Sequence, residues 1–295
     1  MNHRFQFGLL FVLAATLGCA QAAPQMVPGR YPQTVTNGTM QRKFTLTVPK
    51  GYDGTKSVPL VVLLHGWGSN SSQIEDYTGF GAKAQSEGFI LATPDGLGQT
   101  PGWNVGYLDL SGQKQDDAAL VGAIIDKVQG EVTVDAKRIF VVGHSNGAML
   151  ANLVGARFSG KVAAIGSVAG TIGLPTGPNR LIPDPTQPIS VILVHGTADK
   201  MVAYDSAAQS LLKSVGALES AKWWAKADGI SVEPAKMDFD GGKAKLQLFK
   251  GGKQGTEVEL VTVPNGSHDW PGTSRNMSVN ATNIIWDFFK AHPKA

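Results

Sequence analysis

The stretch that decides the fold is RIFVVGHSNGAML, residues 138–150, an apolar run that ends in GHSNG and continues into an apolar helical pattern. Residues 139–142 are β-branched or aromatic, as in a strand that is buried on both faces. GHSNG fits the GxSxG pattern of a nucleophile elbow, a sharp turn between a strand and a helix. Such a turn strains the serine backbone and needs small neighbours, which Gly143 and Gly147 supply. We therefore expect Ser145 to be a catalytic nucleophile, with an ordinary turn between strand and helix as the alternative.

The expected nucleophile needs a base, because a serine hydroxyl attacks well only when a histidine, itself held by a carboxylate, takes its proton. In chains with such an elbow the partners follow in the order Ser, then Asp or Glu, then His. His268 stands in a glycine-rich loop after the last expected strand, and we expect it to be the base, with a structural loop histidine as the alternative. The other five histidines lie in the leader, in the polar tail, at strand ends before glycine, or next to the serine: His3, His292, His65, His195 and His144.

The acid of the site should lie between Ser145 and His268, at the carboxyl end of a strand. Asp199 follows the apolar run 189–194 directly and is the expected acid. Its task is to hold the imidazole in the correct tautomer and to stabilise its charged form. Asp205 is the second candidate, with a capping or solvated role as its alternative, and Asp184 in a proline-rich loop is less well placed.

Acyl transfer also needs hydrogen-bond donors for the oxyanion. One is the backbone N–H of the residue after the nucleophile, Asn146, and the other comes from a loop after an early strand. The motif HGWG at residues 65–68 lies there, so we expect the backbone N–H of Trp67 to be the second donor.

Some loop residues are candidates for substrate contact or for plain loop packing, because aromatic side chains serve both roles. These tentative substrate-binding residues are Trp67, Trp103, Asn104 and Trp270. Three aspartates are expected to have structural roles at turns or helix starts: Asp95, Asp116 and Asp117.

Composition excludes several classes of protein. The 295 residues are 42% hydrophobic and 17% charged, which is typical of one globular domain with a substantial core. The formal net charge is +3, and Lys and Arg are scattered among Asp and Glu. This pattern lacks the basic footprint of a nucleic-acid-binding protein, and the composition is not that of a disordered or membrane-embedded chain. We therefore expect no nucleic-acid partner and, after removal of a leader, no membrane association.

The N-terminus has the pattern of a secretory signal peptide over residues 1–22. A positive start is followed by an apolar run at 7–17, too short to span a bilayer, and by Ala20-Gln21-Ala22. We expect cleavage after Ala22 and a secreted chain, extracellular or periplasmic. The one cysteine, Cys19, falls inside this leader, with a lipoprotein signal as the alternative. The mature chain then has no cysteine for a nucleophile, a disulfide or a metal site.

Apolar runs and helical patterns alternate along the chain at short spacing, which indicates a mainly parallel sheet with helices on both faces. No repeat or linker divides the chain, so we expect a single catalytic α/β domain over residues 23–295. Residues 23–43, rich in Pro, Gly, Thr and Gln, are expected to form a surface lead-in. Strands are expected at 43–48, 59–64, 89–92, 139–142, 162–168, 189–194, 245–249 and 257–263. Helices are expected at 73–87, 116–128, 146–158, 206–227 and 283–290.

Several ordered motifs extend the evidence beyond the elbow: YDG at Tyr52, LLHGWG at Leu63, PDG at Pro94, GWN at Gly102, GHSNGAM at Gly143, HGTAD at His195, HDWPG at His268 and IWDFF at Ile285. On these motifs, from about residue 43 to 289, the chain resembles the secreted α/β-hydrolase esterase family of feruloyl esterases, of the carbohydrate-esterase type, and polyhydroxybutyrate depolymerases. The resemblance implies an α/β-hydrolase fold with Ser145 as nucleophile, Asp199 as acid and His268 as base. The chain departs from the family at Ser69, where a second glycine is frequent, and in its lack of cysteines; these bear on the entrance width and on loop rigidity.

Together these features predict a secreted serine carboxylic-ester hydrolase that works through an acyl-enzyme, with no metal and no organic cofactor. Its expected substrates are phenolic or acetyl esters of plant polysaccharides, or hydroxyalkanoate esters. One alternative is a serine peptidase on the same fold, which would cleave an internal peptide amide. Another is a non-catalytic carbohydrate-binding protein, which would bind glycan without labelling of Ser145 by a fluorophosphonate.

Overall fold

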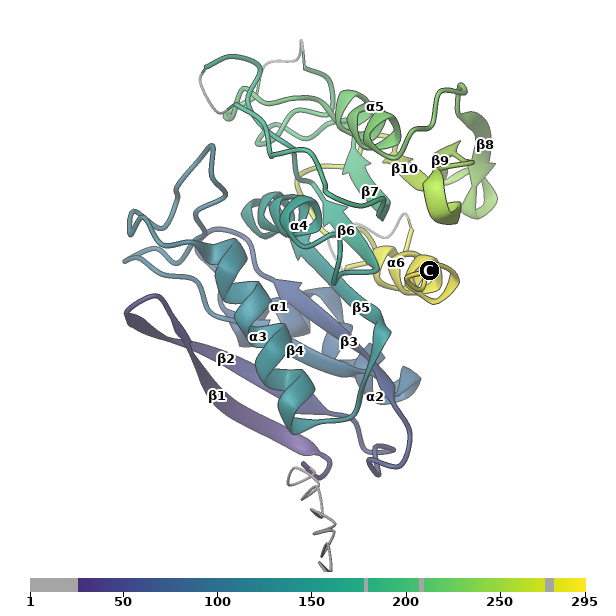
Figure 1. Ribbon diagram of the computed structural model, residues 1–295. Helices are drawn as coiled ribbons and strands as arrows, with labels where there is room; N and C mark the ends of the chain where they lie inside the picture. The colour runs from purple at the N-terminus through teal and green to yellow at the C-terminus, as the bar shows by residue number, and fades with distance from the viewer. Residues whose placement is uncertain (1–25, 178–179, 207–209, 274–278) are drawn as a thin grey trace, which may run out of the picture.

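The computed structural model describes residues 26–177, 180–206, 210–273 and 279–295, in which strands form one sheet flanked by helices (Figure 1). The expected signal peptide, with Cys19 and the cleavage site after Ala22, lies outside the described residues. Within the described ranges, no helix is both long and apolar enough to cross a membrane.

The chain forms ten strands and six α-helices in the described ranges. The strands are β1 (Gly29–Asn37), β2 (Met40–Val48), β3 (Val58–Leu64), β4 (Ile90–Pro94), β5 (Val134–His144), β6 (Ala164–Val168), β7 (Ser190–Gly196), β8 (Ala235–Phe239), β9 (Ala244–Phe249) and β10 (Val258–Val263). The helices are α1 (Ser71–Thr78), α2 (Phe80–Glu87), α3 (Asp117–Glu131), α4 (Asn146–Arg157), α5 (Ala217–Ala227) and α6 (Ala281–Ala291), with short 3₁₀ turns at Asp240–Gly242 and Lys253–Gly255.

The sheet has the order β1-β2-β4-β3-β5-β6-β7-β10-β9-β8. The six central strands, from β4 to β10, pair in parallel, and the strands at both ends of the sheet pair antiparallel. Because parallel strands end at the same edge of the sheet, the loops after β3, β5, β7 and β10 meet there. These loops carry the HGWG motif, the elbow, the expected acid and the expected base.

Helices cover both faces of the sheet, as the sequence predicts. Successive side chains of a strand point to opposite faces. On β3, Leu60, Val62 and Leu64 pack in one apolar cluster, and Val61 and Leu63 pack in the other. The first cluster contains side chains of α3, α4 and α5, and the second contains those of α1, α2 and α6, which lie on the other side of the sheet (Figure 1).

Two expectations near the N-terminus need correction. The predicted surface lead-in over residues 23–43 is wrong, because β1 pairs with β2 over nine residues as an edge strand. An edge position tolerates Pro32 within a strand. The helix expected at 73–87 is instead two helices. Gly79, at φ +73°, ends α1 in the left-handed conformation that glycine adopts readily, and α2 begins at the next residue.

A third correction concerns the helix expected at 206–227. The helix α5 begins at Ala217, after Gly216 in extended conformation. Before it, Leu211 and Leu212 donate backbone hydrogen bonds to Lys200 and Met201, so this segment is tied to the loop after β7. A further strand, β8, is not among the expected ones. It pairs antiparallel with β9 at the far edge of the sheet.

A buried ion pair joins the antiparallel end of the sheet to α3. The Arg42 guanidinium contacts the Asp117 carboxylate at 2.7 Å, and both side chains are buried. The second oxygen of Asp117 accepts a hydrogen bond from the backbone N–H of Asn104 at 2.8 Å. Burial raises the pKa of Asp117, and the Arg42 charge opposes that rise. The pair therefore ties β2, the start of α3 and the GWN loop together.

We expect Asp117→Ala to lower the free energy of unfolding by about 3 to 5 kcal/mol, because it leaves the Arg42 charge buried and unpaired. Urea unfolding of the purified protein measures the effect. Asp126→Ala is the control, since its ion pair with Lys161 is exposed and should contribute less than about 1 kcal/mol. Equal losses in the two variants would show that the buried pair does not have this structural role.

Candidate active site

The elbow holds Ser145 in a strained backbone conformation between β5 and α4, with φ +55° and ψ −119°. The two flanking glycines make this turn possible. A Cβ on Gly143 would lie 2.3 Å from the backbone of Gly147, and a Cβ on Gly147 would lie 2.3 Å from the Leu64 carbonyl oxygen. The backbone N–H of Ser145 donates to the Val168 carbonyl at 2.9 Å. The turn is thus fixed from both neighbouring strands, and a non-strained β-to-α turn does not describe it.

The three residues expected to act together are joined by two hydrogen bonds, with His268 between Ser145 and Asp199. His268 Nε2 is 2.7 Å from Ser145 Oγ, and His268 Nδ1 is 2.7 Å from Asp199 Oδ2. Ser145 stands after β5, Asp199 in the loop after β7 and His268 in the loop after β10. The arrangement has a hydroxyl, an imidazole and a carboxylate in one line of hydrogen bonds.

The carboxylate of Asp199 is buried and surrounded by donors. Its Oδ1 accepts the backbone N–H groups of Met201 at 2.8 Å and Val202 at 2.9 Å. Its Oδ2 lies 3.2 Å from His195 Nε2 in addition to the contact with His268. Burial would raise the pKa of Asp199, but the contacts with the two histidines outweigh it and hold the pKa well below its usual range. Asp199 therefore carries a negative charge throughout the neutral pH range.

The loop that carries His268 is fastened to α1 and α6. The Tyr77 hydroxyl accepts the backbone N–H of Trp270 at 2.8 Å, and it lies 3.4 Å from an oxygen of Asp269. The indole Nε1 of Trp270 donates to the Thr282 hydroxyl at 3.0 Å. Burial raises the pKa of Tyr77, so its hydroxyl stays protonated at neutral pH.

The two expected oxyanion donors stand in the loop after β3 and at the start of α4. Asn146 follows Ser145 at the start of α4, and Trp67 lies in the loop after β3. Neither the Trp67 N–H nor the Asn146 N–H has a hydrogen-bond acceptor in the part of the chain that the structure describes. Both groups are therefore free to donate to a ligand oxygen.

Trp103 and His65 fix this oxyanion loop from behind. Trp103 donates from its backbone N–H to Asn146 Oδ1 and from its indole Nε1 to the His65 carbonyl, both at 2.7 Å. The His65 Nε2 accepts the Gly96 N–H at 2.8 Å, so Nδ1 carries the ring proton and donates to the Gly66 carbonyl at 2.7 Å. Burial lowers the pKa of His65, consistent with a neutral ring in a structural role.

A pocket of about 590 Å³ opens beside Ser145 and His268. Two large apolar side chains on its lining are exposed, Trp67 at 55% and Met201 at 41%. Met201 is a pocket residue that the sequence pattern did not indicate. Its position two residues after Asp199 is the sequence feature that could have placed it near the site. Among the described residues, in the pocket and outside it, no cluster of three or more His, Cys, Asp or Glu side chains could hold a metal ion. The remaining lining includes Gly66, Ser69, Gln73, Ile74, Tyr77, His144 and Asp269.

For three of the four candidate substrate contacts, the structure favours loop packing, the alternative considered for each. Trp103 and Trp270 are almost fully buried, at 0% and 1% exposure, and each indole N–H is satisfied inside the protein. Asn104 is half-buried, and its amide bonds to the backbone of Gln115 and Gly106. These residues shape the loops from behind, and Trp67 is the tentative contact that lines the pocket.

The other aspartates considered have structural or solvent positions. Asp95 accepts the backbone N–H of Ser71, the first residue of α1, and Asp116 caps α3 through the N–H of Ala119. Asp117 forms the buried pair described above. Asp184 and Asp205 are exposed. Neither alternative acid takes the position beside the His268 ring that Asp199 holds.

His144, next to the nucleophile, is a wall of the pocket. Its ring lies 5.3 Å from the His268 ring and 5.7 Å from that of Tyr77. Burial lowers the pKa of His144 to about 3, and the charge of a protonated His268 adds to this effect. The ring is therefore neutral at working pH.

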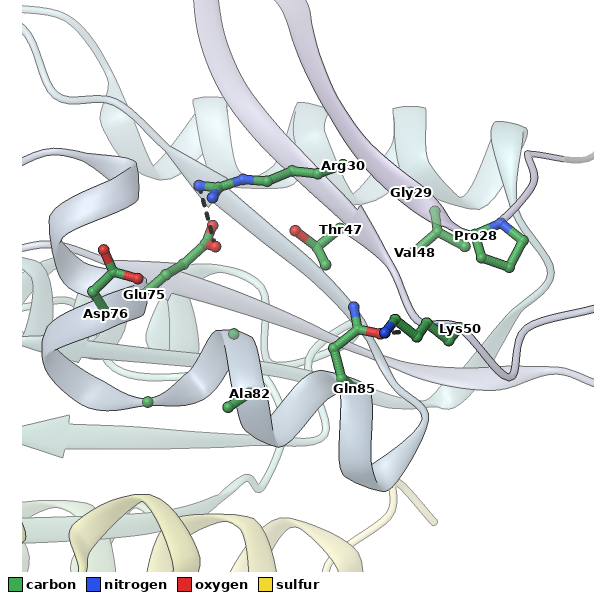
Figure 2. A pocket seen from close by; sticks show the side chains of 12 residues that line it. Pro28, Gly29, Arg30, Thr47, Val48, Lys50, Glu75, Asp76, Ala82 and Gln85 are labelled. Atoms are coloured by element: carbon green, nitrogen blue, oxygen red, sulfur yellow. Dashed lines mark hydrogen bonds and ion pairs between the residues drawn. The ribbon is translucent and has the colours of Figure 1, made fainter.

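A second hollow, of about 560 Å³, lies on another side of α1 (Figure 2). Glu75 and Asp76 line it, whereas their neighbours Gln73, Ile74 and Tyr77 line the pocket at Ser145. Figure 2 shows Arg30 and Glu75 pointing toward each other, with 3.2 Å between the guanidinium and the carboxylate. The helix α1 thus separates this hollow from the candidate active site.

The chain is similar to known esterases. The family model described as "Esterase PHB depolymerase" matches residues 43–175. Feruloyl esterase C of Emericella nidulans is 28% identical over 274 residues, which cover 89% of this chain and 90% of that protein. A protein named as an esterase, NocK of Nocardia uniformis subsp. tsuyamanensis, is 28% identical over 233 residues, 72% of this chain and 66% of that protein.

Solved structures show the same fold. An acetyl xylan esterase from Aspergillus awamori superposes with a TM-score of 0.63 at 15% identity and covers 88% of this chain and 99% of its own. The predicted α/β-hydrolase fold, with a mainly parallel sheet covered on both faces, is confirmed. Over residues 43–175 the chain is similar to the esterase and PHB depolymerase family, and over 89% of its length it is similar to a feruloyl esterase.

Proposed function

We propose that the protein is a secreted serine carboxylic-ester hydrolase in which Ser145, His268 and Asp199 form the catalytic triad. The observation that carries this proposal is the unbroken line of hydrogen bonds from Ser145 Oγ through the His268 ring to the Asp199 carboxylate, with 2.7 Å at each step. The exposed opening beside Ser145 and the two unpaired backbone N–H groups support it.

The first half of the reaction forms an acyl-enzyme. Ser145 Oγ attacks the ester carbonyl carbon while His268 Nε2 takes its proton. The negative charge that develops on the carbonyl oxygen is stabilised by the N–H groups of Trp67 and Asn146. His268 then gives the proton to the leaving alcohol, and the acyl group stays on Ser145.

The second half releases the acid. A water molecule gives a proton to His268 Nε2 and attacks the acyl carbon, and the same two N–H groups stabilise the second tetrahedral intermediate. The proton returns to Ser145 Oγ as the acid leaves. The Asp199 carboxylate stays ionised and stabilises the charged imidazole in both halves.

Substrate and location follow from the relatives and from the leader. Relatives named as feruloyl esterase and acetyl xylan esterase support phenolic or acetyl esters of polysaccharides, and the family description supports hydroxyalkanoate esters. The Trp67 and Met201 side chains favour an apolar or aromatic group near Ser145. The apolar run at residues 7–17 and the Ala20-Gln21-Ala22 site support export.

Ser145→Ala should lower kcat on a p-nitrophenyl ester by about 10⁴-fold or more, because the nucleophile is removed while the fold stays intact. Steady-state kinetics and fluorophosphonate labelling of the purified variant measure this. Ser86→Ala, at an exposed serine of α2 that does not line the pocket, is the matched control and should keep both activity and labelling. Full activity of Ser145→Ala would refute the mechanism.

The value of kcat/KM should fall between neutral pH and pH 4, because a protonated base cannot accept the Ser145 proton. The pKa of His144 is lowered to about 3 and that of Asp199 is also lowered, so neither changes charge in this range. A pH–rate profile on a p-nitrophenyl ester tests the assignment. A flat profile down to pH 4 would contradict the role of His268.

Trp67→Ala should lower kcat/KM for methyl ferulate about two- to tenfold more than for p-nitrophenyl acetate. The variant keeps the backbone N–H and loses the exposed ring that an aromatic acyl group would contact. Trp223→Ala is the control, since this half-buried tryptophan lines a different hollow beside Asp184. Product analysis with methyl ferulate, acetylated xylan and polyhydroxybutyrate in parallel identifies the acyl group, and an equal loss on both small esters would exclude Trp67 as an acyl contact.

A further inference from the structure

The carboxylate of Asp199 has four close donors. Oδ1 accepts two backbone N–H groups, from Met201 and Val202. Oδ2 faces two imidazoles, with 2.7 Å to His268 Nδ1 and 3.2 Å to His195 Nε2. A carboxylate accepts about four hydrogen bonds, so the His195 ring occupies the last position of an otherwise satisfied group.

The tautomer of His195 follows from its partners. Its Nε2 lies 2.9 Å from the Val202 carbonyl oxygen and 3.2 Å from Asp199 Oδ2. Both are acceptors, so Nε2 must carry a proton; it donates to the Val202 carbonyl, and Asp199 Oδ2 lies within contact distance of the same N–H. The ring is buried at the end of β7, packed edge-on against Tyr204, whose hydroxyl lies 2.8 Å from that of Thr262. His195 is therefore held as a fixed donor.

We propose that His195 is a positioning residue of the site, which donates from Nε2 to Asp199 Oδ2 and so orients the carboxylate and limits its basicity toward His268. This inference rests on the proposed triad and adds a fourth member to it. His195 does not reach Ser145; it acts through Asp199.

Without this donor, two changes are expected at Asp199. The carboxylate loses one of the contacts that fix its rotation. A rotated carboxylate no longer holds the His268 ring in the orientation that reaches Ser145. Its charge also becomes less well solvated inside the protein, since the side chain is buried. A less solvated carboxylate attracts the His268 proton more strongly and stabilises the imidazolium before substrate arrives. The base is then lost at a higher pH than in the wild type.

Other titratable groups around Asp199 leave this effect distinguishable. His144 lies beyond the His268 ring, and its lowered pKa keeps it neutral at working pH. Asp269 bonds to Tyr77 and Ser267 on the outer side of the base loop. The hydroxyl of Tyr204 faces Thr262 and not the carboxylate. His195 and His268 are thus the two imidazoles that contact the acid directly.

The test compares two variants of His195. In H195Q the side-chain amide places an N–H near the position of Nε2, whereas H195M keeps the apolar volume and loses the donor. We expect H195M to lower kcat about 10- to 100-fold on a p-nitrophenyl ester, the scale of one hydrogen bond to a charged group, with KM changed less than about threefold. In the pH–rate profile of H195M we expect the acid limb, where kcat/KM falls as the pH drops, to lie about 0.5 to 1 pH unit higher than in the wild type. H195Q should recover most of both effects.

Controls separate this role from packing and from the proposed function. His292 also contacts a carboxylate, at 3.4 Å from Glu257, but lies at the C-terminus, so H292M should leave kcat and the acid limb unchanged. Thermal unfolding shows whether each variant is folded. The pH–rate profile is measured at a temperature at which the variant is folded. Unchanged kcat and acid limb in H195M, or a more active H195M than H195Q, would overturn the inference even if Ser145→Ala is inactive. An active Ser145→Ala would instead overturn the proposed function itself.

Discussion

The site depends on a close approach of backbone segments at the carboxyl edge of the sheet, where side chains would not fit. A Cβ on Gly143 would overlap Gly147, and a Cβ on Gly147 would overlap the end of β3. On the other side of the site, a Cβ on Gly196 would lie 2.2 Å from the Gly266 carbonyl oxygen. The first contact brings the elbow against the loop after β3, which carries Trp67. The second brings the loop that carries His268 against the loop that carries Asp199. Glycine at these positions sets the distances between the reacting groups, because any larger residue would push the loops apart.

Histidine shows how position within one site assigns different tasks to the same side chain. His65 is buried, and its ring links two loops as donor and acceptor. His144 is a neutral wall, His195 touches the acid and His268 joins the acid to the serine. Protonation separates the tasks: an imidazole inside an apolar wall resists a charge, whereas one that faces an ionised carboxylate gains from it. Of these four rings, His268 is the one with both an ionised acid and a hydroxyl within reach.

The sequence predicts the proposed triad because its signals are local or can be reached by elimination. Ser145 has the glycine pattern of the elbow, and Asp199 and His268 follow strands that periodicity identifies. For Trp103 and Trp270 the sequence leaves substrate contact and loop packing open, because a loop position does not fix exposure, and the tertiary structure buries both rings. The contact between His195 and Asp199 could be suspected from their spacing in HGTAD, but the turn that brings them together is fixed by the backbone donors of Met201 and Val202. The break at Gly79 was missed because two short amphipathic helices in sequence have the apolar period of one long helix.

Buried residues also determine the shape of the pocket indirectly, through Trp67. A Cβ on Gly102 would lie 2.9 Å from the indole of Trp67, so the GWN turn supports this ring from below. The next residue, Trp103, fixes the same turn to Asn146 and to the His65 carbonyl. The motif therefore couples the exposed ring, which lines the pocket beside Ser145, to the two backbone donors proposed for the oxyanion. A change in the GWN turn would move the binding surface and the oxyanion donors together, because one set of hydrogen bonds holds both. This coupling is a physical reason for a buried tryptophan to stand behind an exposed one in this loop.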